Sequence, residues 1–211
     1  MPENKIKILD CTLRDGGYYN NWNFKNDLIE EYLLTMKNLD IDYVEIGFRS
    51  LDIEGSKGPT AFSTDKFISS LTNRKNINLG IMINASEIVN NSLSILKKLF
   101  PSNVKSEISF VRIAAHEHEV VKLKKTIDFL KNKKLKVFIN LMQISEYSSD
   151  ILLKKIDYLN TTKTDVLYFA DSLGNLDKSK INKIIYNSKK VWSKPIGFHF
   201  HDNMSRALEN S

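Results

Sequence analysis

Short β-branched runs alternate with longer stretches of helical periodicity along this chain, and that alternation limits its possible folds more than any other feature. Seven apolar runs are strand candidates, at residues 6–9, 43–47, 79–83, 108–113, 137–141, 166–170 and 196–200. Helical spacing appears between them, at residues 27–39, 88–100, 120–130, 151–159 and 181–191. Nearly continuous apolar strands are typical of a parallel sheet that is covered by helices. The pattern therefore predicts a parallel α/β fold.

The helix predicted at residues 27–39 shows this periodicity most clearly. Five of its side chains fall on one face: Leu28, Tyr32, Leu33, Met36 and Leu39. A face of this kind is the part of an amphipathic helix that packs against the core.

Polar side chains gather where the predicted strands end, and their position separates two parallel folds. They are Asp10, Glu45, Arg49, Asn84, Arg112, His116, Gln143, Asp171, His199 and His201. A doubly wound sheet would accommodate seven strands, but in a (β/α)8 barrel all these carboxyl ends share the face that carries the active site. We therefore predict a (β/α)8 TIM barrel. Because such barrels typically have about 250 residues, residues 1–211 are expected to form one catalytic domain truncated after its seventh strand, without the C-terminal strand and helices.

Composition and charge exclude several classes of protein. The chain is 42% hydrophobic with a net charge of +6, and its lysine-rich segment at residues 131–136 lacks the Arg–aromatic interleaving of a nucleic-acid patch. The single cysteine, Cys11, excludes an internal disulfide and a multi-cysteine zinc site. No apolar segment approaches the roughly 20 residues of a membrane span, and no signal peptide is recognisable. We expect a soluble cytoplasmic protein that binds neither nucleic acid nor membrane.

The segment LDCTLRDGGYYNNW, at residues 9–22, places charged groups directly after the first predicted strand. Asp10, Arg14 and Asp15 surround a pair of glycines, Gly16 and Gly17. Charged side chains of this kind are unfavourable in an apolar core, but they can form part of an ion-binding site. The glycine pair predicts a tight turn that lets a substrate approach closely.

The segment GFHFHDN, at residues 197–203, supplies two imidazoles. His199 and His201 are two positions apart, so in a strand they point to the same side. This spacing is a common way to give a divalent metal two nitrogen ligands, although a single buried histidine is more often a hydrogen-bonded core residue. With one carboxylate and open positions, the set suits Mn²⁺, Mg²⁺, Fe²⁺ or Zn²⁺.

Together these two segments resemble the HMG-CoA-lyase-like superfamily of metal-dependent TIM barrels, the DRE-TIM metallolyases. The motifs VEIGF at 44–48, FVRIAAHEHEV at 110–120 and FADSLGNL at 169–176 extend the resemblance over nearly the whole chain. The VRIAAH stretch is most similar to the 4-hydroxy-2-oxovalerate aldolase branch. The superfamily also includes lyases, acyl-CoA-dependent synthases and a carboxyltransferase domain.

The resemblance implies a role for each matching residue. The implied metal ligands are Asp15, His199 and His201, with Mn²⁺ or Mg²⁺ favoured and Zn²⁺ as an alternative. Arg14 would stabilise the enolate of a pyruvate-like fragment, Glu45 would hold Arg14 in place, and Asp10 would support either group. This chemistry is physically consistent, because an enolate is a developing anion that a divalent ion and a guanidinium both stabilise. The implied activity is that of an aldolase or lyase acting on a 2-oxo acid or its aldol adduct.

One position departs from the aldolase branch, which has its histidine base where this chain has Tyr18. A neutral tyrosine is a weak base near pH 7, so Tyr18, its neighbour Tyr19 or a metal-bound water remain candidates. His116, beyond the fourth strand, is another, although it could equally be the first residue of a helix. Arg112 could bind a substrate carboxylate or phosphate, or join a charge network inside the barrel.

Several residues have a plainer interpretation. Cys11 is expected to act as a small buried hydrophobe. The aromatic residues Tyr18, Tyr19, Trp22 and Phe24 are expected to pack the first loop against the barrel, and Asp171 to cap the turn that follows it.

Two other functions stay open at this level. One is an acyl-CoA-dependent Claisen-type synthase of the isopropylmalate or homocitrate type, although no adenine or pyrophosphate site is recognisable. The other is a non-catalytic barrel fragment, since a truncated barrel leaves unpaired strand edges. A homo-oligomer or a partner subunit is compatible with either.

Overall fold

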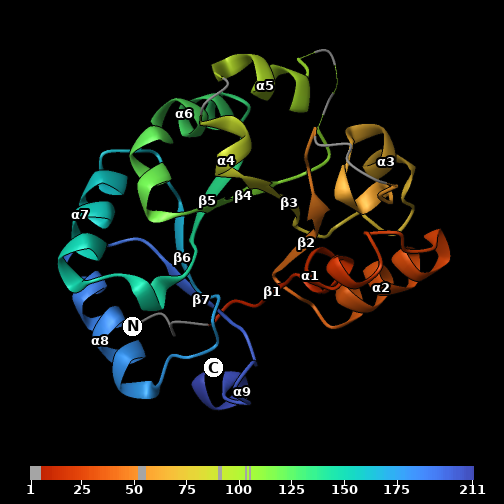
Figure 1. Cartoon of the computed structure of the whole chain (residues 1–211). Coiled ribbons are helices and arrows are strands. Elements are labelled where there is room, and N and C mark those ends of the chain that lie inside the picture. Colours follow the sequence, from red (N-terminus) through yellow and green to blue (C-terminus); the bar gives the residue numbers. More distant parts are fainter. Residues whose placement is uncertain (1–5, 52–55, 90–91, 103, 105) are drawn as a thin grey trace. The chain divides into compact units, whose positions relative to one another are not determined.

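The computed structural model describes residues 6–51, 56–89, 92–102, 104 and 106–211. Its seven strands follow one another in sequence order within a single sheet. They are β1 Leu9–Asp10, β2 Tyr43–Phe48, β3 Leu79–Asn84, β4 Phe110–Ala115, β5 Lys136–Leu141, β6 Val166–Asp171 and β7 Ile196–Phe200 (Figure 1). The recorded pairings β1–β2, β2–β3, β5–β6 and β6–β7 are parallel. Sequential parallel strands with intervening helices are the first seven strands of a (β/α)8 barrel, as predicted.

Helices connect these strands. The α-helices are α1 Thr12–Gly16, α2 Asn26–Asn38, α3 Asp65–Ser70, α4 Ala85–Ile88, α5 Ser92–Leu99, α6 Lys124–Asn132, α7 Ser149–Asn160, α8 Lys178–Val191 and α9 Ala207–Asn210. The 3-10 helices are η1 Gly17–Tyr19, η2 Pro59–Ala61, η3 Glu117–Lys122 and η4 Ile144–Glu146. None of the helices in the described ranges is long and apolar enough to cross a bilayer.

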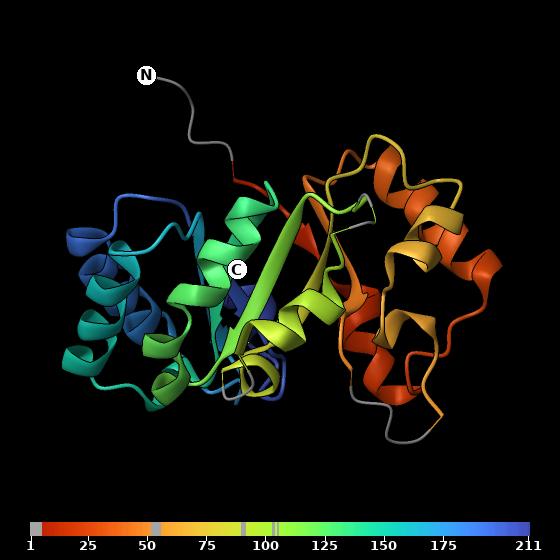
Figure 2. The ribbon, with the colours of Figure 1, turned by 90° about the horizontal axis from the view of Figure 1, so that it is seen from above.

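The chain divides into two compact units. The first unit comprises Met1–Ile83 and Ser94–Val111, and the second comprises Asn84–Leu93 and Arg112–Ser211. In the first unit, β2 is buried along its whole length. Figure 2 shows that α2 and α3 lie on the same side of β1 and β2.

In the second unit, β5, β6 and β7 pair in register, with Leu141 opposite Phe169 and Ala170 opposite His199. Helices α7 and α8 lie side by side on one face of these strands (Figure 1). Both begin at side-chain caps, because Ser148 accepts a hydrogen bond from the Ile151 N–H and Asp177 accepts one from the Lys180 N–H. The face of α7 that enters the core carries Leu152, Ile156 and Leu159.

Helix α2 corrects the predicted face. Its buried residues are Ile29 and Leu33, whereas Leu28 is 48% exposed and Leu39 is 63% exposed. Leu28 and Ile29 are adjacent apolar residues, so the sequence supports two overlapping faces about 100° apart. Packing against the sheet selects the face that includes Ile29.

Other predicted elements also differ in their bounds. The first strand is Leu9–Asp10 rather than 6–9, because Ile6 and Ile8 are exposed and do not enter the core. The fourth strand begins at Phe110 rather than Ile108. The helix expected over 88–100 is divided between α4 and α5, and the one expected over 120–130 begins as the 3-10 helix η3 before α6.

Candidate active site

Asp10 fixes the end of β1 through three hydrogen bonds. Its carboxylate accepts bonds from the Thr12 N–H at 2.9 Å, the Thr12 hydroxyl at 3.2 Å and the Tyr32 hydroxyl at 2.5 Å. Burial, together with the negative charge of Asp10, raises the pKa of Tyr32, which keeps that hydroxyl a donor. Asp10 therefore joins β1, the start of α1 and helix α2. None of these three bonds comes from Arg14 or a metal-ligand candidate, so the supporting role that the resemblance implies for Asp10 stays a prediction.

Arg14 is buried on α1 and pairs with two carboxylates. Its Nε donates to Glu45 Oε1 at 2.9 Å, and its Nη1 donates to Asp15 Oδ1 at 2.7 Å. Glu45 lies on β2 and is fully buried, while the Asp15 side chain is 39% exposed. A buried guanidinium with paired carboxylates keeps its charge and a fixed orientation. The Arg14–Glu45 contact is the one that the resemblance implied.

Two further groups touch the Arg14 guanidinium. Its Nη2 donates to Cys11 Sγ at 3.6 Å, and its carbon Cζ lies 5.9 Å from the centre of the Phe48 ring. Cys11 is only partly buried, so the expected small buried hydrophobe is instead a half-exposed sulfur beside the cation. The structure gives it a polar contact that its sequence position did not indicate.

Trp22 fixes the Arg14 backbone. The indole N–H donates to the Arg14 carbonyl at 2.8 Å. The Trp22 ring centre lies 4.8 Å from that of Tyr18 and 5.6 Å from that of Phe48. The packing interpretation is confirmed for Trp22 and Tyr18, whose rings contact each other, with Trp22 packed against Phe48 of β2. Tyr19, by contrast, is 96% exposed and does not share in this packing.

The glycine pair does not form the tight turn that the sequence suggested. Both residues have right-handed helical angles, with φ of −63° at Gly16 and −60° at Gly17. A Cβ on Gly17 would lie 2.0 Å from Cδ1 of Trp22, whereas one on Gly16 would meet nothing within 4 Å. Gly17 is therefore needed for the close approach of the indole ring.

Tyr18 is a poor candidate for a base by its own electrostatics. Partial burial of the hydroxyl raises the pKa of Tyr18, the Arg14 charge lowers it and the Asp15 charge raises it, with a net upward shift. The phenol is therefore neutral at physiological pH, and its hydroxyl is a hydrogen-bond donor.

In the second unit, the two histidines lie side by side. His199 is in β7 and His201 follows it directly, with ring centres 4.9 Å apart and ring planes at 82°. The loop after β6 packs against this segment, because a Cβ on Gly174, whose φ is +61°, would lie 3.0 Å from the His201 carbonyl oxygen. Two adjacent imidazoles are a donor pair that divalent ions accept, and the half-exposed Asp15 offers a carboxylate oxygen of the kind that completes such a set. The donor chemistry fits a divalent metal, while coordination of one ion by Asp15, His199 and His201 stays a prediction.

Asp171 performs the capping role expected of it. Its buried carboxylate accepts hydrogen bonds from the Asn175 N–H at 3.1 Å and the Leu176 N–H at 3.2 Å. Arg112, also buried, has its guanidinium carbon 5.3 Å from the centre of the Tyr168 ring. Both roles expected for Arg112, substrate binding and membership of an internal charge network, stay predictions.

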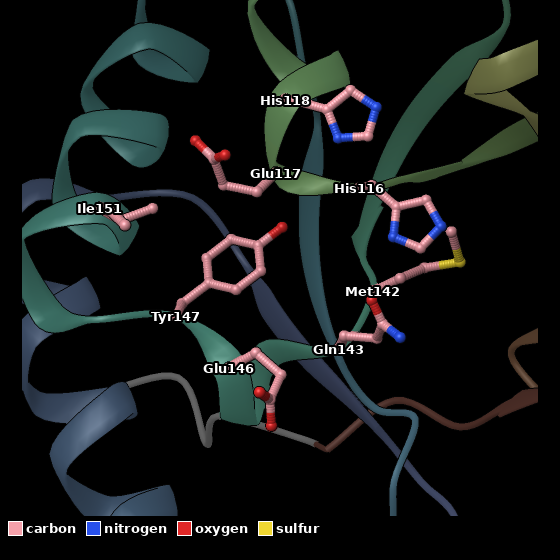
Figure 3. Close-up of a pocket in the computed structure, with 8 residues that line it drawn as sticks. All are labelled: His116, Glu117, His118, Met142, Gln143, Glu146, Tyr147 and Ile151. Carbon is pink, nitrogen blue, oxygen red and sulfur yellow. The ribbon is translucent and has the colours of Figure 1, made fainter.

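His116 begins the 3-10 helix η3, which supports its structural interpretation. Its backbone N–H donates to Glu119 Oε2 at 2.8 Å, and its ring is parallel to that of His118 at 6.0 Å between centres. His116 also lines a cavity of about 230 Å³ at the ends of β4 and β5 (Figure 3). It thus has access to a space for a small molecule, and its role as a base stays a prediction.

Two contacts of candidate site residues could not be read from the sequence. Trp22 contacts Arg14 across eight positions within a loop, and Tyr147 lines the cavity beside His116. Neither contact has a periodic signal. The only indications were an aromatic residue close to a charged motif and a tyrosine in the segment between β5 and α7.

The strand order, together with charged and imidazole groups after several strands, defines a protein of the (β/α)8-barrel class with a candidate cation site. The chain belongs to the HMGL-like family, whose model matches residues 5–211. This membership confirms the resemblance drawn from the motifs.

The relatives carry different activities in their names. The chain is 24% identical over 220 residues to a 4-hydroxy-2-oxovalerate aldolase from Geobacillus genomosp. 3, which covers 100% of this chain and 61% of the relative. It is 21% identical over 207 residues to an oxaloacetate decarboxylase from Mycobacterium tuberculosis, covering 97% of this chain and 59% of the relative. The chain thus spans about 60% of the length of these curated relatives.

A solved structure supports the same fold. The N-terminal domain of a proposed aldolase from Bacteroides vulgatus superposes with a TM-score of 0.84 at 27% sequence identity, over 98% of this chain and 68% of that one.

Proposed function

We propose that this chain forms the barrel part of a divalent-metal-dependent aldolase or lyase, which makes or breaks a carbon–carbon bond next to a carbonyl through the enolate of a pyruvate-like fragment. The observation that carries the proposal is Arg14, a buried guanidinium held by Glu45 at 2.9 Å and by Asp15 at 2.7 Å. The names of the relatives agree with this reaction class, because an aldolase and a decarboxylase both break a carbon–carbon bond.

The role of Arg14 follows from its fixed position. An enolate places negative charge on an oxygen, and donors that are already oriented stabilise this charge without rearranging during the reaction. Glu45 orients the Nε side of the guanidinium, and Trp22 holds the backbone of the same residue. A lysine could neutralise charge but could not keep two carboxylates and an oxyanion on one planar group.

Asp15, His199 and His201 are the residues that would hold the metal. When bound, a divalent ion supplies a Lewis acid for the carbonyl oxygen. The Asp15 carboxylate accepts a hydrogen bond from Arg14, so the same carboxylate would link the guanidinium to the ion.

Tyr18 and His116 are the two candidates for proton transfer. The raised pKa of Tyr18 favours its action as a proton donor, because the phenol stays protonated across the physiological pH range. His116 lines a cavity and presents an imidazole there, a group that can accept or donate a proton in catalysis. We assign the donor to Tyr18 and the acceptor to His116. The acyl-CoA-dependent synthase remains the alternative reaction.

The test measures pyruvate release from a 4-hydroxy-2-oxo acid and from oxaloacetate, with and without added Mn²⁺, for the chain and for Arg14→Lys. We expect Arg14→Lys to lower kcat by about 10²–10³-fold, the effect of removing one fixed oxyanion donor. The matched control is Arg74→Lys, since Arg74 in the same unit contacts Glu107 at 3.8 Å and the Leu71 carbonyl rather than the groups around Arg14. Full activity in Arg14→Lys would contradict the proposal, and thiol release from acetyl-CoA in the presence of a 2-oxo acid would instead support the synthase.

A further inference from the structure

The cavity beside His116 lies wholly within the second unit, at the carboxyl ends of β4 and β5. Its walls come from the loop that begins at His116 and from the segment that follows β5 (Figure 3). At about 230 Å³ it is smaller than the roughly 300–1,000 Å³ of pockets for drug-sized ligands. It therefore suits a molecule of only a few heavy atoms.

Tyr147 presents a polar group in this cavity that the fold itself does not use. Its hydroxyl is buried, and within the described ranges no hydrogen-bond partner is found for it. Figure 3 shows the Tyr147 ring directed across the cavity, with its hydroxyl towards the segment that carries His116 and Glu117. Buried polar groups in folded proteins almost always have partners, so an unsatisfied hydroxyl in a cavity wall indicates a place for a ligand.

Carboxylates surround this hydroxyl. Glu117 forms an ion pair with Lys155, and the buried Glu119 accepts the His116 N–H at 2.8 Å. Burial, with the charges of Glu117 and Glu119, raises the pKa of Tyr147, so the phenol remains a donor. Glu146 lines the cavity together with Glu117, so the lining itself carries two carboxylates. An anionic ligand would meet this negative charge and be disfavoured.

The remaining choice is between a cation and a neutral hydroxyl compound. An ammonium group has donors only, so it could donate to the glutamates and to the Tyr147 oxygen but would leave the Tyr147 proton without an acceptor. An alcohol does both, because its oxygen accepts while its proton is donated. Met142 and Ile151 give the same cavity apolar walls for a short carbon chain.

The backbone at the cavity wall is also unusual. Gln143 has a left-handed conformation with φ of +54°, and its N–H donates to the Ser172 hydroxyl at 2.9 Å. A non-glycine residue in this region of φ and ψ is strained, and such strain is concentrated at binding sites. The strained residue lines the cavity together with Tyr147.

We propose that this cavity binds a small, uncharged, hydroxyl-bearing organic molecule, whose hydroxyl accepts a hydrogen bond from Tyr147 and donates one to Glu117. The proposal shares only the cavity wall at His116 with the proposed function, because no metal, enolate or residue of the first unit takes part in it.

The test is a two-dimensional amide NMR titration of the metal-free chain with four probes: glycerol, erythritol, acetate and ethylamine. We expect saturable shifts with the two polyols around Gln143 and Tyr147, and weaker or absent binding of acetate and ethylamine. Tyr147→Phe removes only the hydroxyl oxygen and is expected to weaken polyol binding roughly fivefold. Tyr186→Phe is the control, since Tyr186 is an exposed residue of α8.

Three results would overturn the proposal. These are the lack of saturable polyol binding, equal polyol affinity in Tyr147→Phe, or tighter binding of acetate or ethylamine than of glycerol. The amide spectrum of each variant reports its folding in the same experiment. Because the measurement contains no metal and no reaction, its failure is separate from failure of the lyase assay.

Discussion

Hydrogen bonds fix both the side chain and the backbone of Arg14, and the partners of the side chain differ from the partner of the backbone. Glu45 and Asp15 bind the guanidinium, while the Trp22 indole binds the carbonyl oxygen. The indole can reach that oxygen only because its ring lies directly against Gly17. The position of the guanidinium thus depends on a residue that has no side chain.

The two neighbouring glycines provide a matched test of this dependence. Gly17→Ala is expected to lower the free energy of unfolding by about 1–3 kcal/mol, the usual cost of forcing extra volume into a packed site, because its Cβ would lie 2.0 Å from the Trp22 ring. Gly16→Ala is expected to be neutral or to stabilise by about 0.4–1 kcal/mol, since its helical angles suit alanine. Urea denaturation followed by tryptophan fluorescence measures both, and equal effects would rule out the Gly17–Trp22 contact.

At the scale of elements, local patterns in the sequence were enough to place β2 to β7, because a buried parallel strand is a continuous apolar run. The first strand was displaced, since Ile6 and Ile8 are apolar but exposed. Local patterns did not identify the buried face of α2, since Leu28 and Ile29 are both apolar and only packing decides between them. The candidate site, too, was only partly predictable from the sequence. The motif containing Arg14 and Asp15 was recognisable from sequence, whereas the bond from Trp22 and the unsatisfied hydroxyl of Tyr147 arise from tertiary contacts without periodicity.

Helix α2 is attached to the segment after α3 by one carboxylate. Glu30 accepts hydrogen bonds from the Thr72 N–H at 2.6 Å and the Asn73 N–H at 2.9 Å. Burial tends to raise the pKa of Glu30, but these hydrogen bonds outweigh it and lower the pKa overall. A lowered pKa means that the folded state binds this proton less tightly than the unfolded state does. The stabilisation is therefore fully present above the unfolded pKa of about 4.3 and is lost as the pH falls through the lower folded value.

Glu30→Gln tests this linkage. We expect the variant to unfold at a lower urea concentration than the wild type at pH 7, with the difference constant down to about pH 5 and shrinking below about pH 4. Glu31→Gln is the control, because Glu31 is an exposed neighbour on the same helix. A difference that stays constant down to pH 3 would show that the charge of Glu30 does not contribute to the attachment.

At the scale of the whole molecule, the residues proposed for catalysis come from both compact units. Arg14, Asp15 and Glu45 belong to the first, and the two histidines belong to the second. The chain spans about 60% of its curated relatives. The proposed activity requires the carboxylate of the first unit and the histidines of the second unit to bind the same metal ion. The hypothesis that they do comes from the sequence motifs.

A double-mutant cycle in Mn²⁺ binding decides this hypothesis without any assay of activity. Mn²⁺ that binds only the folded chain raises its midpoint of thermal unfolding by mass action. Mutation of a residue that hydrogen-bonds a metal ligand typically lowers metal affinity 10–100-fold. Asp15→Asn and His199→Gln change the proposed ligands themselves, so each should lower the Mn²⁺ affinity by at least about a hundredfold. If both residues bind one ion, the double variant should lose much less than the product of the two single effects. Asp27→Asn, an exposed change at the start of α2, is the control for charge alone. If the two single losses of Mn²⁺ affinity multiply in the double variant, the carboxylate and the imidazoles do not bind the same cation. The metal site of the proposed lyase would then be wrong.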